Sequence, residues 1–141
     1  GARGPGPGAR LFLVDTMGEL AKAYSLADVV VVGRSFNGWG GSDPIEPVAL
    51  GKATIIGPDH HNFADAVDAL RQGGGIVECD TPAGAAEAVA NLLANGAAAS
   101  QLAAAGRKVI LSRQGATARY ADLLLRLLGE PSENHDQKSK T

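Results

Sequence analysis

A glycine-rich segment, residues 32–47, holds the part of this chain best suited to bind a small charged ligand. It is expected to leave a buried strand and enter a helix near Asp43, with Ser42 or Asp43 as the N-cap and Pro44 at the first helical position. Backbone N–H groups in such a loop and the positive end of the helix dipole favour phosphate. The segment therefore predicts an anion site. A flexible loop that only joins a strand to a helix would explain the same glycines, which are Gly33, Gly38, Gly40 and Gly41.

One carboxylate in this segment has the position needed to bind a sugar. Glu46 falls in the first turn of the expected helix and is flanked by Pro44 and Pro47. A carboxylate held there can accept hydrogen bonds from vicinal hydroxyls such as those of a ribose. An acidic residue favoured by the helix dipole is the structural alternative.

A second acidic stretch, Asp15 to Glu19, has a sufficient local explanation. Asp15 or Thr16 can cap a helix, and Glu19 lies at capping-box distance from Thr16. Taken from the residues alone, this stretch needs no ligand.

Short apolar runs alternate along the chain with segments of helical spacing. Continuous apolar strands indicate burial on both faces, which is typical of a parallel sheet covered by helices. The pattern predicts an α/β fold, a doubly wound parallel sheet of the Rossmann-like type, with its binding edge at the carboxyl ends of the strands. The expected strands are Leu11–Val14, Val29–Val32, Thr54–Ile56 and Gly75–Val77. The expected helices are Met17–Leu26, Phe63–Leu70, Ala85–Leu93 behind a Thr81 cap and Pro82, Ser100–Leu111, and Ala116–Leu128 after a break near Gly115.

Size and composition limit the class of protein. The chain has 141 residues and a formal net charge of -2, which argues against a domain that binds nucleic acid through its phosphates. Its single cysteine, Cys79, excludes an internal disulfide, and no apolar stretch approaches the roughly 20 residues of a transmembrane helix. We expect one domain over residues 11–128, a flexible linker at 1–10 and a disordered tail at 129–141. Because the first residue is Gly1, we expect the chain to be a piece of a longer protein.

Several blocks of the sequence resemble, in order and spacing, the carboxyl-terminal half of the 3-deoxy-D-manno-octulosonic acid (Kdo) transferases. The resemblance runs from about Leu11 to about Leu128. It implies a single C-terminal domain of a GT-B glycosyltransferase, the domain that holds the nucleotide of CMP-Kdo. The blocks are Asp15–Leu20, Tyr24, Ala27–Asp28, Val32–Gly33 with Ser35, Gly40–Gly41, Glu46–Pro47, Gly57–Pro58 and Asn62–Phe63.

The resemblance also implies which residues bind the donor and what the whole enzyme does. It implies inverting transfer of Kdo from CMP-Kdo to a lipid A precursor, without a metal or another cofactor. The catalytic base belongs to an amino-terminal domain, so this piece contains no catalytic residue and is expected to be inactive by itself. The implied location is cytoplasmic, at the inner face of the inner membrane. The implied donor-binding residues are Met17, Gly18 and Glu19 in a first stretch, Asp43, Pro44, Ile45 and Glu46 in a second, and Ser35, Gly40 and Gly41 between them.

Two departures from the family pattern affect the anion site. The family usually has Gly-Gly-Ser where this chain has Gly33-Arg34-Ser35, and Gly-Gly-His-Asn where it has Gly40-Gly41-Ser42-Asp43. An aspartate near a phosphate is unfavourable unless it turns away to cap the helix, which is the geometry we expect for Asp43. The guanidinium of Arg34 could compensate, since it pairs well with phosphate oxygens.

Three side chains near the binding edge keep open interpretations. His60 and His61 are expected to line the donor pocket; a metal site is the less favoured alternative. Trp39 is expected to fold back onto the domain surface, with exposure for sugar or interdomain contact as the alternative. At the level of function, a GT-B transferase that uses a UDP- or GDP-sugar and a non-catalytic α/β binding module remain the alternatives.

Overall fold

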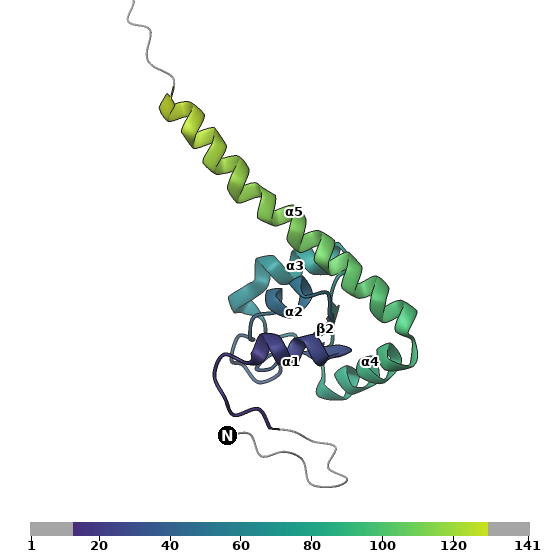
Figure 1. The fold of residues 1–141 in the computed structure, drawn as a ribbon. Helices are drawn as coiled ribbons and strands as arrows, with labels where there is room; N and C mark the ends of the chain where they lie inside the picture. Colours follow the sequence, from purple (N-terminus) through teal and green to yellow (C-terminus); the bar gives the residue numbers. More distant parts are fainter. Residues whose placement is uncertain (1–12, 130–141) are drawn as a thin grey trace, which may run out of the picture. The chain divides into compact units, whose positions relative to one another are not determined.

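The computed structural model describes residues 13–129 and the side chains of residues 13–113. By its internal contacts the chain divides into two compact units, and the boundary in the sequence falls between Leu111 and Ser112. The fold below is that of the first unit (Figure 1). Its elements are α1 (Leu20–Leu26), β1 (Val29–Val31), α2 (Ile45–Ala49), β2 (Ala53–Ile56), the 3₁₀ turn η1 (His61–Phe63), α3 (Ala64–Gln72), β3 (Val77–Glu78), α4 (Pro82–Ala94) and α5 (Gly96–Gly129), the last of which continues into the second unit.

The three strands form one parallel sheet in the order β1-β2-β3. Val29 pairs with Ala53 at one end of the β1–β2 ladder, and Ile55 pairs with Val77 between β2 and β3. All four residues of β2 are buried, as expected for a central strand covered on both faces. Both α2 and α4 contact β2. The predicted α/β fold with a parallel sheet is therefore confirmed.

The core lies between β2 and the helices α2, α3 and α5. Ile110 brings α5 into this core. A close backbone approach fixes α5 there, because a methyl group on Gly106 would meet the carbonyl oxygen of Gly75 at 2.6 Å and the side chain of Val48 at 2.7 Å. The buried cluster consists of Val32, Val48, Ile56, Val67, Leu70, Ile76 and Ile110.

The first expected strand, Leu11–Val14, is wrong in its described part. Leu13 and Val14 are not in a strand, and Leu13 is 84% exposed; residues 11 and 12 lie outside the described residues. An apolar run becomes a strand only where a neighbour supplies backbone hydrogen bonds, and among the described residues β1 pairs with β2 alone. The expected unit that began with this strand is therefore absent from the described structure.

The helix α1 begins later than predicted. Gly18 has a φ of +84°, which is outside the helical region, so the helix starts at Leu20 rather than Met17. Glu19 is then the residue before the helix, and the hydroxyl of Thr16 donates to its carboxylate at 2.6 Å. The capping box between Thr16 and Glu19 does not form.

The carboxyl-terminal helices also differ from the prediction in one respect. The Thr81 cap is confirmed, since its hydroxyl oxygen accepts the Gly84 N–H at 3.1 Å and Pro82 opens α4. The predicted break near Gly115 is wrong, because α5 runs without interruption to Gly129. One glycine costs a helix about 1 kcal/mol, which the alanines and leucines around it offset. The predicted tail thus overlaps α5 at Gly129, while residues 1–12 and 130–141 lie outside the described residues.

None of the helices in the described part of the chain combines the length and the hydropathy that crossing a bilayer requires.

Candidate functional site

The glycine-rich loop after β1 doubles back on itself. The N–H of Ser42 donates to the carbonyl of Gly33, and the N–H of Gly41 donates to the carbonyl of Arg34, both at 3.1 Å. Gly40 and Gly41 have φ values of +79° and +77°, which L-residues with a side chain rarely adopt. The start of the loop is therefore held beside the residues that lead into α2.

The same loop is packed against the segment that follows β2. A methyl group on Gly40 would overlap the side chains of Asn62 and His61, and one on Gly41 would meet the carbonyl of Asp59 at 3.0 Å. The N–H of Asn62 also donates to the carbonyl of Gly40 at 3.3 Å. The loops after β1 and β2 thus meet at the carboxyl edge of the sheet, where the sequence predicted a binding site.

Ser35 joins the two loops from within the protein. Its side chain is fully buried; its hydroxyl donates to the Val32 carbonyl at 2.7 Å and accepts the Gly57 N–H at 2.9 Å. The backbone carbonyl of Ser35 accepts the N–H of Asp59 at 3.0 Å. We infer that Ser35, predicted to bind the donor, acts on the site by positioning these loops.

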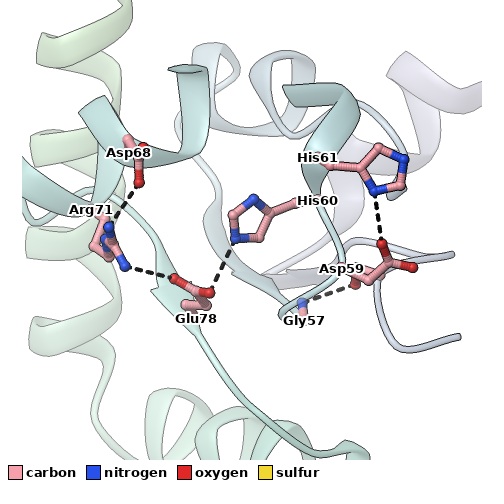
Figure 2. Close-up of polar contacts among 8 residues, drawn as sticks. Gly57, Asp59, His60, His61, Asp68, Arg71 and Glu78 are labelled. Carbon is pink, nitrogen blue, oxygen red and sulfur yellow. Dashed lines mark hydrogen bonds and ion pairs between the residues drawn. The ribbon is translucent and has the colours of Figure 1, made fainter. Parts of the chain in front are cut away.

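Asp59 places a carboxylate inside the glycine-rich loop. One of its oxygens, Oδ2, accepts the Gly40 N–H at 3.1 Å. Figure 2 shows the contact of the other oxygen, Oδ1, which lies 3.1 Å from Nδ1 of His61. The Gly40 N–H is the main cause that lowers the pKa of Asp59 below its ordinary value. Desolvation opposes this shift in part, and His61 and the backbone N–H of Trp39 lower the pKa further. The loop does stabilise negative charge, as predicted, but the charge is the protein's own.

The phosphate cradle predicted from backbone N–H groups stays a prediction, but most of its donors are already engaged within the protein. The N–H groups of Gly40, Gly41 and Ser42 donate to acceptors within the protein. In addition, α2 has only five residues, so its dipole is small. A phosphate at this edge needs a positive group from elsewhere.

The start of α2 has the predicted capping geometry. Oδ1 of Asp43 accepts the Ile45 N–H at 2.7 Å, so the carboxylate turns toward the helix, as expected. The helix begins at Ile45, so Pro44 is the residue before it and not the first helical residue as predicted. Pro44 and Pro47 are fully buried, while Ile45 and Glu46 are exposed. The two prolines anchor the turn in the core and leave Glu46 facing outward.

Tyr24 completes this corner and was not predicted as a site residue. It lies on α1, which packs against α2. Partial burial raises the pKa of Tyr24, and the nearby carboxylates of Glu46 and Asp43 raise it further. The phenol is therefore held in its protonated form beside the two acids. The effect of these two carboxylates on Tyr24 depends on the folded arrangement, so the sequence alone could not show it. The signal that the sequence did contain is that Tyr24 belongs to the blocks that carry the family resemblance.

The first predicted stretch, residues 17–19, lies before α1. Met17 is 99% exposed, Gly18 takes the left-handed conformation, and Glu19 is bonded to Thr16 and lies 3.9 Å from Lys22. The polar contacts that the structure gives for Glu19 are thus with residues three positions away on either side. The binding role of this stretch stays a prediction.

The two histidines after β2 have different partners. Nε2 of His60 lies 3.0 Å from Oε1 of Glu78, and Arg71 donates to the other oxygen of that carboxylate, Oε2, at 3.3 Å (Figure 2). His61 is instead hydrogen-bonded to Asp59. Nδ1 of His60 is buried and has no hydrogen-bond partner. In the described part of the chain, no group of three or more His, Cys, Asp or Glu side chains could hold a metal ion.

A cation lies on the loop next to its tryptophan. Arg34 has a φ of +60°, and its guanidinium carbon lies 5.3 Å from the centroid of the Trp39 ring. Trp39 is 62% exposed, so the expectation that it folds back onto the surface is wrong.

Comparison with known proteins places this fold and site in context. No protein-family model matches the chain. The chain is 38% identical over 130 residues to a 3-deoxy-D-manno-octulosonic acid transferase from Bordetella pertussis, and the match covers 92% of this chain and 30% of that protein. It is 35% identical over 121 residues to the transferase of the same name from Haemophilus influenzae, covering 85% of this chain and 28% of that protein. The C-terminal CMP-Kdo binding domain of WaaA from Acinetobacter baumannii matches it with a TM-score of 0.66 and 33% identity, over 69% of this chain and 51% of that one.

The fold and its binding edge define a Rossmann-like domain of the GT-B type. More particularly, the resemblance drawn from the motifs is confirmed: most of this chain is similar to Kdo transferases, and its fold matches the C-terminal CMP-Kdo binding domain of WaaA. The chain spans about 30% of the length of the curated relatives that it matches.

Proposed function

We propose that this chain is the donor-binding part of a Kdo transferase and that it binds the nucleotide of CMP-Kdo. The observation that carries the proposal is the match, in both fold and sequence, to the C-terminal CMP-Kdo binding domain of WaaA. The position of Glu46 in α2, which follows the loop at the carboxyl end of β1, supports it, because ligands of such folds bind at that edge of a parallel sheet.

In this proposal Glu46 binds the ribose. Its carboxylate is exposed on a turn that two fully buried prolines anchor, so little ordering is needed when the ligand arrives. Two carboxylate oxygens can accept hydrogen bonds from two vicinal hydroxyls. The protonated hydroxyl of Tyr24 offers a donor in the same corner.

The part that this domain plays in transfer is to hold the departing nucleotide. None of the donor-binding residues is placed as a general base, and we propose that the base belongs to another part of the whole enzyme. We propose inverting transfer without a metal or another cofactor, and we expect this chain by itself to bind nucleotide weakly and to be inactive.

Calorimetry with CMP, UMP and GMP tests the proposal. We expect CMP to bind most tightly. Glu46→Ala should weaken CMP binding by about 1.5–3 kcal/mol, since a hydrogen-bonded charged group is lost, and should leave the unfolding midpoint nearly unchanged. Glu87→Ala, which removes an exposed carboxylate from α4, serves as the control and should bind CMP as the unaltered chain does. A clear preference for UMP or GMP would contradict the Kdo assignment and favour another GT-B donor.

The acceptor and the location rest on the family resemblance. We propose a lipid A precursor as the acceptor, a role in lipopolysaccharide biosynthesis, and a cytoplasmic site at the inner face of the inner membrane. The full-length parent protein, given CMP-Kdo and a lipid A precursor, should transfer Kdo and should fractionate with inner membranes. Absence of transfer under conditions where it binds CMP would contradict this acceptor.

A further inference from the structure

We propose that Arg34, held over the ring of Trp39, binds the phosphate of the donor nucleotide. The proposal rests on the function proposed above and adds a residue that the family pattern does not contain, since the family usually has glycine at this position. It starts from the need for a positive group at a binding edge rich in acids.

The charges around the loop show why such a group is required. Asp43 and Glu46 lie at the start of α2, and the carboxylate of Asp59, from the segment after β2, contacts the glycine-rich loop. Three of the N–H groups predicted to meet a phosphate, those of Gly40, Gly41 and Ser42, already donate to acceptors in the protein. An anionic ligand would therefore be repelled unless a cation offsets these carboxylates.

Arg34 is the cation with the right position. Its backbone carbonyl accepts the N–H of Gly41 at 3.1 Å, and this hydrogen bond holds Arg34 beside the loop residues that lead into α2. The other basic groups among the described residues nearby are engaged: His61 is bonded to Asp59, and Arg71 bridges Asp68 and Glu78.

The guanidinium is positioned and still open to a ligand. Its contact in the described structure is the face of Trp39, at 5.3 Å from the ring centroid, and none of the described ion pairs includes it. A ring contact orients a guanidinium without using its five N–H donors. Those donors fit phosphate oxygens in pairs.

The backbone of Arg34 indicates that its side chain is not there for stability. A φ of +60° is unfavourable for any residue with a side chain, and glycine adopts it without strain. Retaining arginine at such a position opposes stability, and strained residues of this kind cluster at binding sites. Binding and stability should thus respond in opposite directions when the side chain is removed.

Two variants test the proposal by calorimetry with CMP and with cytidine, which lacks the phosphate. Arg34→Gln should weaken CMP binding about 10- to 100-fold, the loss expected for hydrogen bonds to a charged group, and should leave cytidine binding unchanged. Arg34→Gly should weaken CMP binding to the same degree and raise the thermal unfolding midpoint, because the strain is relieved. Arg107→Gln, which removes an exposed arginine from α5, is the matched control.

A lower unfolding midpoint in Arg34→Gly, or equal CMP affinity in Arg34→Gln, would overturn the proposal.

Trp39 is the single tryptophan of the chain, so its fluorescence gives a readout that does not depend on the base. Pyrophosphate should change this fluorescence in the unaltered chain and not in Arg34→Gln. If pyrophosphate acts in this way but CMP is not preferred over UMP and GMP, the Kdo assignment fails while the role of Arg34 stands. If CMP is preferred and Arg34→Gln binds CMP as well as the unaltered chain does, the Kdo assignment stands and the role of Arg34 fails. If neither CMP nor pyrophosphate binds the unaltered chain, both proposals fail.

Discussion

Asp43 shows how one side chain can depart from a family pattern without spoiling a site. Its carboxylate is turned back to accept the Ile45 N–H at 2.7 Å. Negative charge at the start of a helix is favourable, so the same geometry that satisfies the backbone also reduces repulsion toward an incoming anion. The residue therefore serves α2 first.

We predict that Asp43→Asn changes stability and CMP affinity little, because asparagine is an equally good cap. Asp43→Ala, in contrast, should lower the free energy of unfolding by about 0.5–2 kcal/mol. Urea denaturation measures the free energy of unfolding of both variants, and calorimetry measures the CMP affinity of Asp43→Asn. Tightening of CMP binding by tenfold or more in Asp43→Asn, about 1.4 kcal/mol, would mean that the carboxylate faces the ligand.

Asp59 makes the stability of the loop depend on acid. Its pKa is lower in the folded chain than in the unfolded chain, chiefly because the Gly40 N–H favours the ionised form. A carboxylate shifted in this direction stabilises the fold above the unfolded pKa of about 4, and the contribution disappears as the pH falls through the folded value.

We therefore predict that the unaltered chain loses more stability between pH 5 and about pH 2 than Asp59→Asn does. Thermal unfolding monitored across this range makes the comparison. Asp80→Asn, at an exposed position, should behave as the unaltered chain. Equal acid sensitivity of Asp59→Asn and the unaltered chain would show that the Gly40 bond does not stabilise the ionised carboxylate.

At the scale of elements, the contact between α5 and the turn before β3 controls how the core closes. Gly106 and Gly75 approach so closely that neither can carry a side chain without moving the other segment. Gly106 lies inside a helix, where alanine would otherwise be preferred by about 1 kcal/mol. The packing requirement thus outweighs the helix propensity at this position.

Gly106→Ala should therefore lower the free energy of unfolding by about 1–3 kcal/mol, the usual range for an overfilled core. Gly84→Ala is the control, because its new methyl group would meet the Thr81 hydroxyl at 3.4 Å, an ordinary contact, within α4. This control should be neutral or more stable by up to about 1 kcal/mol. Urea denaturation distinguishes the two, and a stabilised Gly106→Ala would contradict the close approach.

Local pattern predicted most elements, and the failures have physical causes. The runs Val29–Val31 and Ala53–Ile56 became strands because β-branched residues dominate both and the two runs pair with each other in the sheet. Leu13 and Val14 are also apolar, but they have no strand to pair with in the described structure. Whether a run finds such a partner depends on long-range contacts, which local pattern does not reveal. The late start of α1 depends on a single dihedral angle, that of Gly18.

The sequence predicted where the site lies but not which groups are hydrogen-bonded to one another. The sequence located the loop, Glu46 and the Asp43 cap, because each follows from local turn and helix chemistry. It could not show that Asp59, which is 19 residues from Gly40, takes the N–H expected to meet a ligand. The pairing of Arg34 with Trp39 likewise depends on how the loop folds back.

At the scale of the whole molecule, the sheet arrangement has a consequence for how the chain behaves in solution. In the described residues β1 is an edge strand of valines, and Val31 is 45% exposed. The backbone groups on its outer side are a template onto which a strand of a second molecule can add. We therefore expect reversible self-association at high protein concentration, detectable as light scattering that rises with concentration and falls on dilution. Storage at low concentration, rather than any added ligand, should keep the chain monodisperse.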